Sequence, residues 1–226
     1  MNNKLQQIKE FAQKHLGKDQ CSAHSMDHVM RVFNLANTLA KGQKVDLEVI
    51  QIAALLHDIG GAQEANDKSG KTDHALVSAQ MADPFLRKLG YNEEKIQHIK
   101  DCIETHRYRT TRRPKTLEAK IVFDADKLET VGAIGVARAY AWVGKHNAYL
   151  YRKVDIKKYA DENLGGSLKG RIQDRSKHSP QINWETKDKH IVNYLYTPQA
   201  KKIAKARKKY FEQFLDKLER EIQGKE

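Results

Sequence analysis

The sequence predicts an all-α protein of seven to ten helices. Apolar residues recur at steps of three and four along most of the 226 residues, which is the spacing of one face of a helix. The alternation of apolar and polar residues that is typical of strands is nearly absent. Residues that cap helices, chiefly glycine, asparagine and aspartate, stand where these patterns begin and stop. A chain of this length can bury a substantial core.

The first 128 residues are expected to hold six helices. Their expected ranges are 5–16, 27–41, 47–58, 73–89, 92–105 and 117–128. We expect Gly60 and Gly61 to terminate the third helix, and Pro84 to bend or split the fourth. Residues 59–72 are rich in Gly, Asn, Asp, Lys and Ser, so we expect a loop there.

The rest of the chain is expected to add a helix ending near Trp142, a helical segment over 184–196 and a long last helix from Pro198. Glycines and Ser179-Pro180 break up residues 144–183, where only 155–162 is expected to be helical. The role of this broken segment is open between a lid and a dimer contact. The last helix is expected to bury one face, formed by Ile203, Ala206, Tyr210, Phe211, Phe214, Leu215, Leu218 and Ile222.

Composition indicates a soluble globular protein. Hydrophobic residues make up 39% of the chain and charged residues 31%, and no apolar run reaches the length of a membrane span. The residues after Met1 show no signal-peptide core, and two cysteines are too few for a disulfide framework. We therefore expect a cytoplasmic protein with no membrane partner.

The formal net charge is +12 and is unevenly distributed. From residue 145 onward there are 20 Lys and Arg against 11 Asp and Glu, whereas the first 144 residues hold 21 against 18. A basic surface attracts phosphate-bearing partners, whether nucleotides or nucleic acid. A lysine-rich helix can equally be a solvated face, so charge alone does not choose the partner.

One stretch carries the strongest chemical signal. The apolar run from Ala53 to Leu56 is followed directly by His57 and Asp58. Two ionisable groups at the end of a buried helix cost free energy unless they are paired or bind a metal. His28 and Asp126 also lie in helical segments whose other face is apolar. Two imidazoles and two carboxylates suit a divalent ion such as Mn, Fe, Ni or Zn, with positions left for a water or a phosphoryl oxygen.

These groups stand in segments that resemble the HD-domain metal-dependent phosphohydrolases. The matching segments, in the order of that superfamily, are His24 to Val32, Leu55 to Gly60 and Asp124 to Glu129. The following Val131 to Arg138 is similar to a subgroup of small bacterial and archaeal HD proteins, some described as nucleotide pyrophosphohydrolases. The resemblance covers about residues 20–140.

The resemblance implies a single HD domain over residues 1–226, a helical bundle with the metal site at its centre. Its core spans about 20–140, and a helical extension spans about 144–226. One divalent ion is implied, with Mn preferred and Mg, Ni, Fe, Zn or Co as alternatives. The implied ligands are His28, His57, Asp58 and Asp126.

His74 and His106 stand where some HD families place two further histidines. They either bind a second ion, or contact substrate phosphate and shuttle protons together with Asp58, or are helix-end residues without a role. We favour the second interpretation because the subgroup is better described by one ion. A di-iron oxygenase, which would need both histidines as ligands, is a further alternative.

Weaker candidates surround this set. Arg31 is expected either to pair with a ligating carboxylate or to hold a phosphate, and His24 either to face the pocket or to cap its loop. Lys127 and Arg107 are expected either to contact substrate phosphate or to be exposed to solvent. Arg31 follows His28 by three residues, and so shares its helix face. Asp27 is either an outer partner that orients a ligating histidine or a plain helix N-cap.

The preferred function is hydrolysis of a nucleotide, or another small phosphate ester or anhydride, by a metal-activated water. Cleavage of a (deoxy)nucleoside triphosphate to monophosphate and pyrophosphate is the leading case. The alternatives are a phosphodiesterase or phosphomonoesterase of the same superfamily, and a basic nucleic-acid-binding helical module. Nucleic acid is not favoured because no reader motif is seen and the aromatic residues of the last helix fall on its apolar face. A homodimer is left open.

Overall fold

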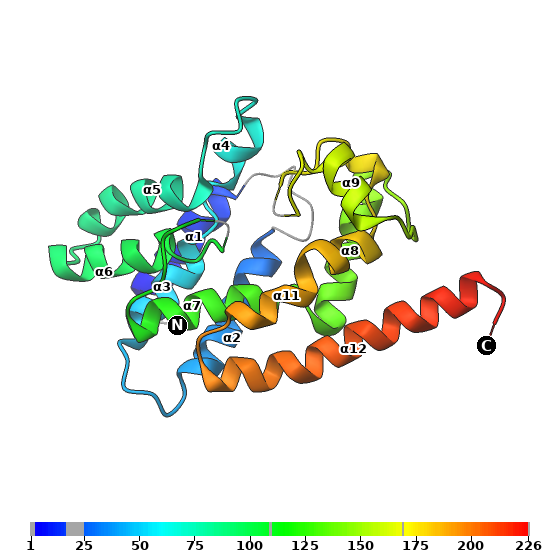
Figure 1. Ribbon diagram of the computed structural model, residues 1–226. Coiled ribbons are helices and arrows are strands. Elements are labelled where there is room, and N and C mark those ends of the chain that lie inside the picture. The colour runs from blue at the N-terminus through cyan, green and yellow to red at the C-terminus, as the bar shows by residue number, and fades with distance from the viewer. Residues whose placement is uncertain (1–2, 17–24, 109, 169, 226) are drawn as a thin grey trace. The chain divides into compact units, whose positions relative to one another are not determined.

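The computed structural model describes residues 3–16, 25–108, 110–168 and 170–225 (Figure 1). It confirms the all-α prediction, since no strand occurs in this part of the chain. None of the described helices combines the length and the apolar character that a membrane span requires. The chain divides into two compact units, Met1–Asp126 and Lys127–Glu226, and we describe each by itself.

The first unit is built from helices whose bounds lie close to those expected. They are α1 (Asn3–His15), α2 (Met26–Ala40), α3 (Leu47–Leu56), α4 (Gly61–Asn66), α5 (His74–Lys88), α6 (Glu93–Glu104) and most of α7 (Leu117–Leu128). The side chains of Asp46, Asp73 and Asn92 accept hydrogen bonds from the first backbone amides of α3, α5 and α6. These bonds satisfy amides that have no partner within the helix, and so fix where each helix starts.

Helix α3 is the centre of the first unit. It packs against α1, α2, α5 and α6. From Val49 to Leu56 every residue except Gln51 is buried. A helix that is apolar on nearly all sides must be covered on all sides. The chain therefore delivers the next two residues, His57 and Asp58, to the edge of a fully packed core.

Two local expectations for the first unit need correction, the loop over 59–72 and the split at Pro84. The segment 59–72 is not all loop, because it contains the short helix α4, which packs against α5. Pro84 does not split the predicted fourth helix, and α5 continues through it to Lys88. A proline removes one backbone hydrogen bond from a helix, and α5 packs against α6.

Gly60 has a different role from the expected helix stop, since α3 already ends at Leu56. A Cβ at this position would lie 2.7 Å from the carbonyl oxygen of His74 and 2.8 Å from the backbone nitrogen of Ser78. The backbone nitrogen of Gly60 also donates to the Ser78 hydroxyl (2.9 Å). Gly60 is therefore the point at which the start of α5 touches the turn after α3, and only glycine allows that approach.

The second unit contains α8 (Gly132–His146), α9 (Ile156–Asn163), α10 (Pro180–Asn183), α11 (Lys189–Ile191) and α12 (Pro198–Ile222). A π-helical stretch, Trp184–Asp188, joins α10 to α11. The expected short helix over 155–162 is confirmed, whereas the segment expected over 184–196 is an irregular helical run that already starts at Pro180.

The last helix starts at Pro198 as predicted, with Thr197 as its N-cap. It packs against α8, and Phe211 is buried. The predicted apolar face is wrong at Ala206, Tyr210 and Ile222, which are exposed, Tyr210 by 49% and Ile222 by 51%. The apolar stripe of this helix is therefore only partly buried.

Candidate metal centre

The orientation of His57 is fixed by the end of its own helix. Its Nδ1 donates to the carbonyl oxygen of Ala54 (2.9 Å). A neutral imidazole that is protonated on Nδ1 keeps a lone pair on Nε2. That Nε2 atom lies 3.3 Å from Nε2 of His28 and 3.4 Å from Oδ2 of Asp58. His57 thus presents a lone pair to a carboxylate oxygen.

His28 and Asp126 reach the same point from α2 and α7. Nε2 of His28 lies 3.5 Å from Oδ2 of Asp58 and 3.4 Å from Oδ1 of Asp126. Both histidines are buried, whereas the side chains of Asp58 and Asp126 keep exposed fractions of 13% and 12%. The structure therefore brings the four predicted ligands together and leaves solvent access on the carboxylate side.

This donor set fits a divalent ion. The lone pair on Nε2 of His57 and the oxygen of Asp58 repel each other unless a cation or a proton lies between them. Imidazole nitrogens together with carboxylate oxygens are the mixed set that divalent transition metals take in proteins. His28, His57 and Asp58 each offer one such atom, and these atoms lie within 4.8 Å of one another.

The other carboxylate oxygen of Asp58 faces two more histidines. Oδ1 lies 3.4 Å from Nε2 of His74 and 3.5 Å from Nε2 of His106, and these two nitrogens are 3.1 Å apart. His74 is the first residue of α5, and His106 follows the end of α6. Asp58, His74 and His106 form a second trio of possible metal ligands, with Asp58 shared between the two trios.

His106 is held in the same way as His57. Its Nδ1 donates to the carbonyl oxygen of Ile103 (2.6 Å), three residues earlier at the end of α6. Its Nε2 therefore carries the lone pair. Burial lowers the pKa of His106 to about 4, and the neighbouring Asp58 carboxylate only partly opposes that shift. His106 is thus neutral at physiological pH.

Glu64 joins the centre although no sequence pattern predicts it. Its Oε2 accepts a hydrogen bond from Nδ1 of His74, and its Oε1 accepts one from Arg107 (2.8 Å). Glu64 lies on α4, inside the segment expected to be a loop, and nothing in the local sequence sets it apart from a surface acid. Only the packing of α4 against α5 brings it to His74.

The carboxylates of the centre are held in the ionised form. Burial raises the pKa of Asp58, but the neighbouring imidazoles of His57, His106 and His28 outweigh it, so that the pKa lies well below the usual range. Burial likewise raises the pKa of Glu64, but the bonds from His74 and Arg107 lower it to about 2. Both groups therefore carry a negative charge at neutral pH.

His74 is placed between these two negative charges. Burial lowers its pKa, but the hydrogen bond to Glu64 and the charge of Asp58 more than compensate, and the pKa is raised above the ordinary value. Its side chain keeps an exposed fraction of 19%, the largest among the histidines of the two trios. His74 is therefore the histidine of the centre that is best placed to carry a proton to a bound molecule.

Arg107 forms an ion pair with Glu64. Its guanidinium pairs with Asp73 (2.9 Å) as well as with Glu64, and Asp73 also pairs with Arg112. Asp73 is in addition the N-cap of α5. The sequence left Arg107 open between substrate phosphate and solvent, and the structure shows it paired with two carboxylates beside His74.

The remaining predicted residues are placed as follows. Arg31 is half-buried on α2, and Lys127 follows Asp126 directly on α7. Asp27 is exposed on the first turn of α2, and its interpretation as an N-cap is wrong because Ser25 occupies that position. His24 lies outside the described residues.

Comparison with known proteins relates these residues to a family. Residues 26–131, which include both trios and Asp126, match the family model described as HD domain. The uncharacterized protein YpgQ of Bacillus subtilis is 26% identical over 223 residues, covering 97% of this chain and 94% of YpgQ. An uncharacterized protein of Methanocaldococcus jannaschii is 32% identical over 126 residues, covering 49% of this chain and 69% of that protein.

Solved structures share the fold along nearly the whole chain. The crystal structure of B. subtilis YpgQ in complex with ADP gives a TM-score of 0.71 at 22% identity and covers 97% of this chain and 98% of YpgQ. An HD-superfamily hydrolase from Bacillus thuringiensis gives a TM-score of 0.68 at 24% identity and covers 97% of each chain. The resemblance seen in the sequence motifs is confirmed, and the chain belongs to the HD-domain family.

Proposed function

We propose that this protein is a divalent-metal-dependent phosphohydrolase that cleaves a phosphoanhydride bond of a nucleotide. The observation that carries the proposal is the convergence of His28, His57, Asp58 and Asp126, whose nitrogens and oxygens approach one another at 3.3 to 3.5 Å. Membership of the HD-domain family supports it. A nucleotide is supported by the similar protein YpgQ, which was crystallised in complex with ADP.

The four converging residues would hold the ion, for which we propose Mn²⁺. A divalent ion in such a site lowers the pKa of a bound water and polarises a phosphoryl oxygen. The protein contributes the fixed orientation of the ligands. Ala54 holds the His57 ring through Nδ1, so that Nε2 needs no proton rearrangement before it binds a cation.

We assign His74 and His106 to the substrate rather than to a second ion. Glu64 binds Nδ1–H of His74, which leaves Nε2 facing Asp58 and the solvent-accessible side of the centre. A protonated ring in this place can hydrogen-bond a phosphate oxygen and give a proton to the leaving group. His106 presents a lone pair on Nε2 next to it and can accept a proton.

The number of bound ions tests this assignment. The trio of Asp58, His74 and His106 also has the donor types of a metal site. Elemental analysis of protein loaded with Mn²⁺ and dialysed should give one ion per chain, unchanged in His74→Ala. Two ions per chain, falling to one in His74→Ala, would show that these histidines are ligands and would overturn their role toward substrate.

A substrate screen tests the function itself. The protein is incubated with Mn²⁺ and (deoxy)nucleoside triphosphates, diphosphates, monophosphates and a phosphodiester, and phosphate and pyrophosphate are measured separately. We expect pyrophosphate and nucleoside monophosphate from a triphosphate. Release of phosphate alone, or cleavage of only the diester, would point to the monoesterase or diesterase alternative.

Variants connect the activity to the centre. His57→Ala and Asp58→Ala should abolish hydrolysis, whereas His190→Ala, which alters an exposed histidine of the second unit, should leave it unchanged. Equal rates in all three variants would refute the proposed site.

A further inference from the structure

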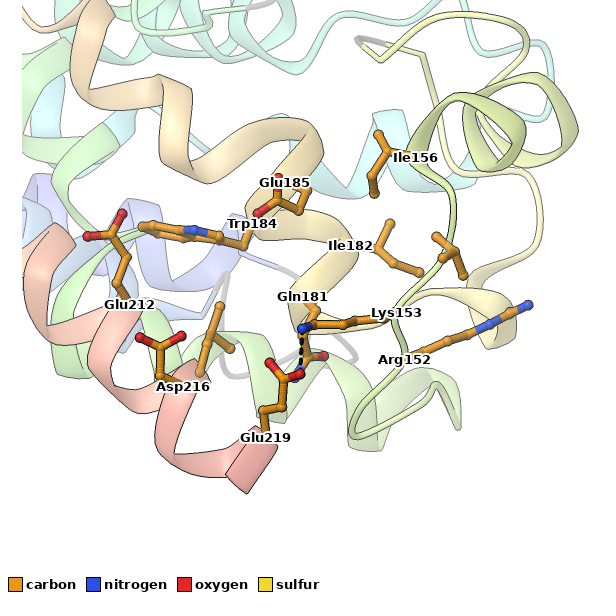
Figure 2. A pocket seen from close by; sticks show the side chains of 12 residues that line it. Arg152, Lys153, Ile156, Gln181, Ile182, Trp184, Glu185, Glu212, Asp216 and Glu219 are labelled. Atoms are coloured by element: carbon orange, nitrogen blue, oxygen red, sulfur yellow. Dashed lines mark hydrogen bonds and ion pairs between the residues drawn. The ribbon is translucent and has the colours of Figure 1, made fainter. Parts of the chain in front are cut away.

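A cavity in the second unit is not used by the proposed function. It has a volume of about 400 Å³ and is lined by α12, the helical run from Gln181 to Glu185, and residues 152–156 (Figure 2). This volume lies within the range of small-molecule sites in proteins. Every lining residue belongs to the unit Lys127–Glu226, whereas the four proposed metal ligands belong to the other unit.

The amide of Gln181 is the first indication of a ligand. Gln181 lines the cavity with an exposed fraction of only 7%. Neither its Oε1 nor its Nε2 has a hydrogen-bond partner within the described residues. The side chain of Gln181 is close enough to Tyr140 to oppose the rise that burial causes in the pKa of that phenol, but neither amide atom meets hydrogen-bond geometry. The Tyr140 hydroxyl donates to the carbonyl oxygen of Leu150 (3.3 Å). Buried amides in native proteins almost always have partners, so this one calls for a molecule that offers both a donor and an acceptor.

The charge of the lining is the second indication. The carboxylates of Glu212, Asp216 and Glu219 on α12 line one side of the cavity, and Glu185 adds a fourth. In Figure 2, Glu219 is paired to Lys153, whereas Glu212 stands at the other end of the lining, beside the Trp184 ring. In a chain with a net charge of +12, this lining has four carboxylates against two cationic side chains.

Three of these four carboxylates already have a lysine partner. Glu219 pairs with Lys153, Glu185 with Lys189 and Glu212 with Lys208 (3.8 Å). Lys153 is paired with Glu219 alone among the described carboxylates. The guanidinium of Arg152 donates to the carbonyl oxygen of Lys177 (3.0 Å) and lies 5.0 Å from the centre of the Tyr149 ring. Asp216 is the lining carboxylate that forms no ion pair within the described residues, so it is the group that attracts a cation and repels a phosphate.

The rest of the lining is apolar. Ile182, Trp184 and Leu215 belong to it. The indole of Trp184 is held in place by stacking on Phe211, with ring centres 4.7 Å apart and an angle of 11° between the planes. Such a wall suits a short aliphatic chain, which loses water-exposed area when it lies against the indole.

We propose that this cavity binds a small organic cation that carries an amide group, with the chemistry of a lysine amide. The amide of the ligand pairs with Gln181, its N–H donating to Oε1 and its carbonyl accepting from Nε2. Its ammonium group lies beside Asp216 on α12, and its aliphatic chain lies against Trp184 and Leu215. One molecule thereby gives the buried amide its hydrogen bonds, places a positive charge beside a carboxylate and covers the apolar wall.

The proposal is tested by titrating the full-length protein with L-lysinamide. The chain has two tryptophans, so Trp142→Phe leaves Trp184 as the only indole reporter of binding. We expect a saturable change in its fluorescence. Norleucinamide lacks the side-chain ammonium, and lysine methyl ester lacks the amide donor. Each should bind roughly tenfold more weakly, as the loss of one polar contact requires.

Variants of the lining complete the test. Gln181→Leu removes the amide without creating a buried unsatisfied group, so it should fold normally and bind at least tenfold more weakly. Asp216→Asn should also weaken binding, whereas the matched charge change Asp161→Asn on the exposed face of α9 should not. Asp58→Asn at the metal centre should bind lysinamide normally, which separates this proposal from the proposed function.

Three results would overturn the proposal. The first is the absence of a saturable signal with L-lysinamide. The second is equal affinity for all three compounds. The third is unchanged binding in Gln181→Leu together with Asp216→Asn.

Discussion

Glu64 and Asp58 hold the imidazole of His74 from opposite sides, one at Nδ1 and the other 3.4 Å from Nε2. The proton on Nδ1 is therefore donated to Glu64, and Nε2 of the ring faces Asp58 in the metal centre. Because Arg107 in turn binds Glu64, three side chains from different parts of the first unit fix the direction of one nitrogen atom.

Glu64→Gln should lower kcat/KM roughly 10- to 100-fold, which is the usual effect of losing an outer partner of a site residue. Since the bond to Glu64 raises the pKa of His74, its removal should lower that pKa. If His74 acts as the proton donor, the high-pH limb of the rate profile moves to lower pH. Glu94→Gln, an exposed acid on α6, should change neither quantity. An unmoved profile in Glu64→Gln would contradict the role of His74.

Mn²⁺ should raise the melting temperature of the wild-type protein. A ligand at 100 times its Kd stabilises the folded state by about 2.7 kcal/mol, which corresponds to roughly 5–10 °C for a chain of this length. Asp58→Asn should lose this shift because both trios share Asp58. The exposed Asp101→Asn should retain it. Thermal unfolding with and without Mn²⁺ measures the effect, and equal shifts in the two variants would argue against the site.

Gly60→Ala should destabilise the protein by roughly 1–3 kcal/mol, the usual cost of forcing extra atoms into a packed region. The new methyl group would press on the backbone at His74 and Ser78, so hydrolysis should fall as well. Gly144→Ala is the control, because a Cβ there meets nothing within 4 Å and lies inside α8. It should be neutral or stabilise by about 0.4–1 kcal/mol. Urea unfolding at neutral pH gives the free energy of unfolding of both variants. Similar values for Gly60→Ala and Gly144→Ala would contradict the close contact between Gly60 and the start of α5.

The second unit should lose stability in acid through His178. Burial lowers the pKa of His178 to about 4, against an ordinary value of 6.5. Its Nδ1 accepts a hydrogen bond from the hydroxyl of Tyr159 (2.8 Å), which is possible only for an Nδ1 without a proton. The unfolded chain therefore binds the proton more readily than the folded one, and stability rises with pH between about 4 and 6.5.

The contribution of His178 is at most about 3 kcal/mol, fully present above pH 6.5 and lost as the pH falls to 4. The free energy of unfolding is measured in urea at pH 7 and pH 4.5. It should depend less on pH in His178→Gln than in the wild type. In His190→Gln, which alters an exposed histidine, the pH dependence should be unchanged. A wild-type-like slope in His178→Gln would show that other groups cause the acid sensitivity.

The sequence predicted the helices that have a strong period and a cap, such as α3 with Asp46 and α12 with Thr197. It also predicted which four groups converge, because the resemblance to a family supplied partners far apart in the chain. Glu64 could not be found in this way, since its role depends on how α4 lies against α5. Gln181 is a second case, because only the structure shows that its amide is buried without a partner.

His57 and His106 share one local geometry, in which each ring donates Nδ1–H to a carbonyl three residues earlier at the end of a helix. Each of these contacts is contained within four consecutive residues, 54–57 and 103–106. The tautomer of each ring is thus chosen by the chain next to it and does not depend on the rest of the fold. The same four residues placed at the C-terminal end of another helix should therefore orient an imidazole lone pair in the same direction.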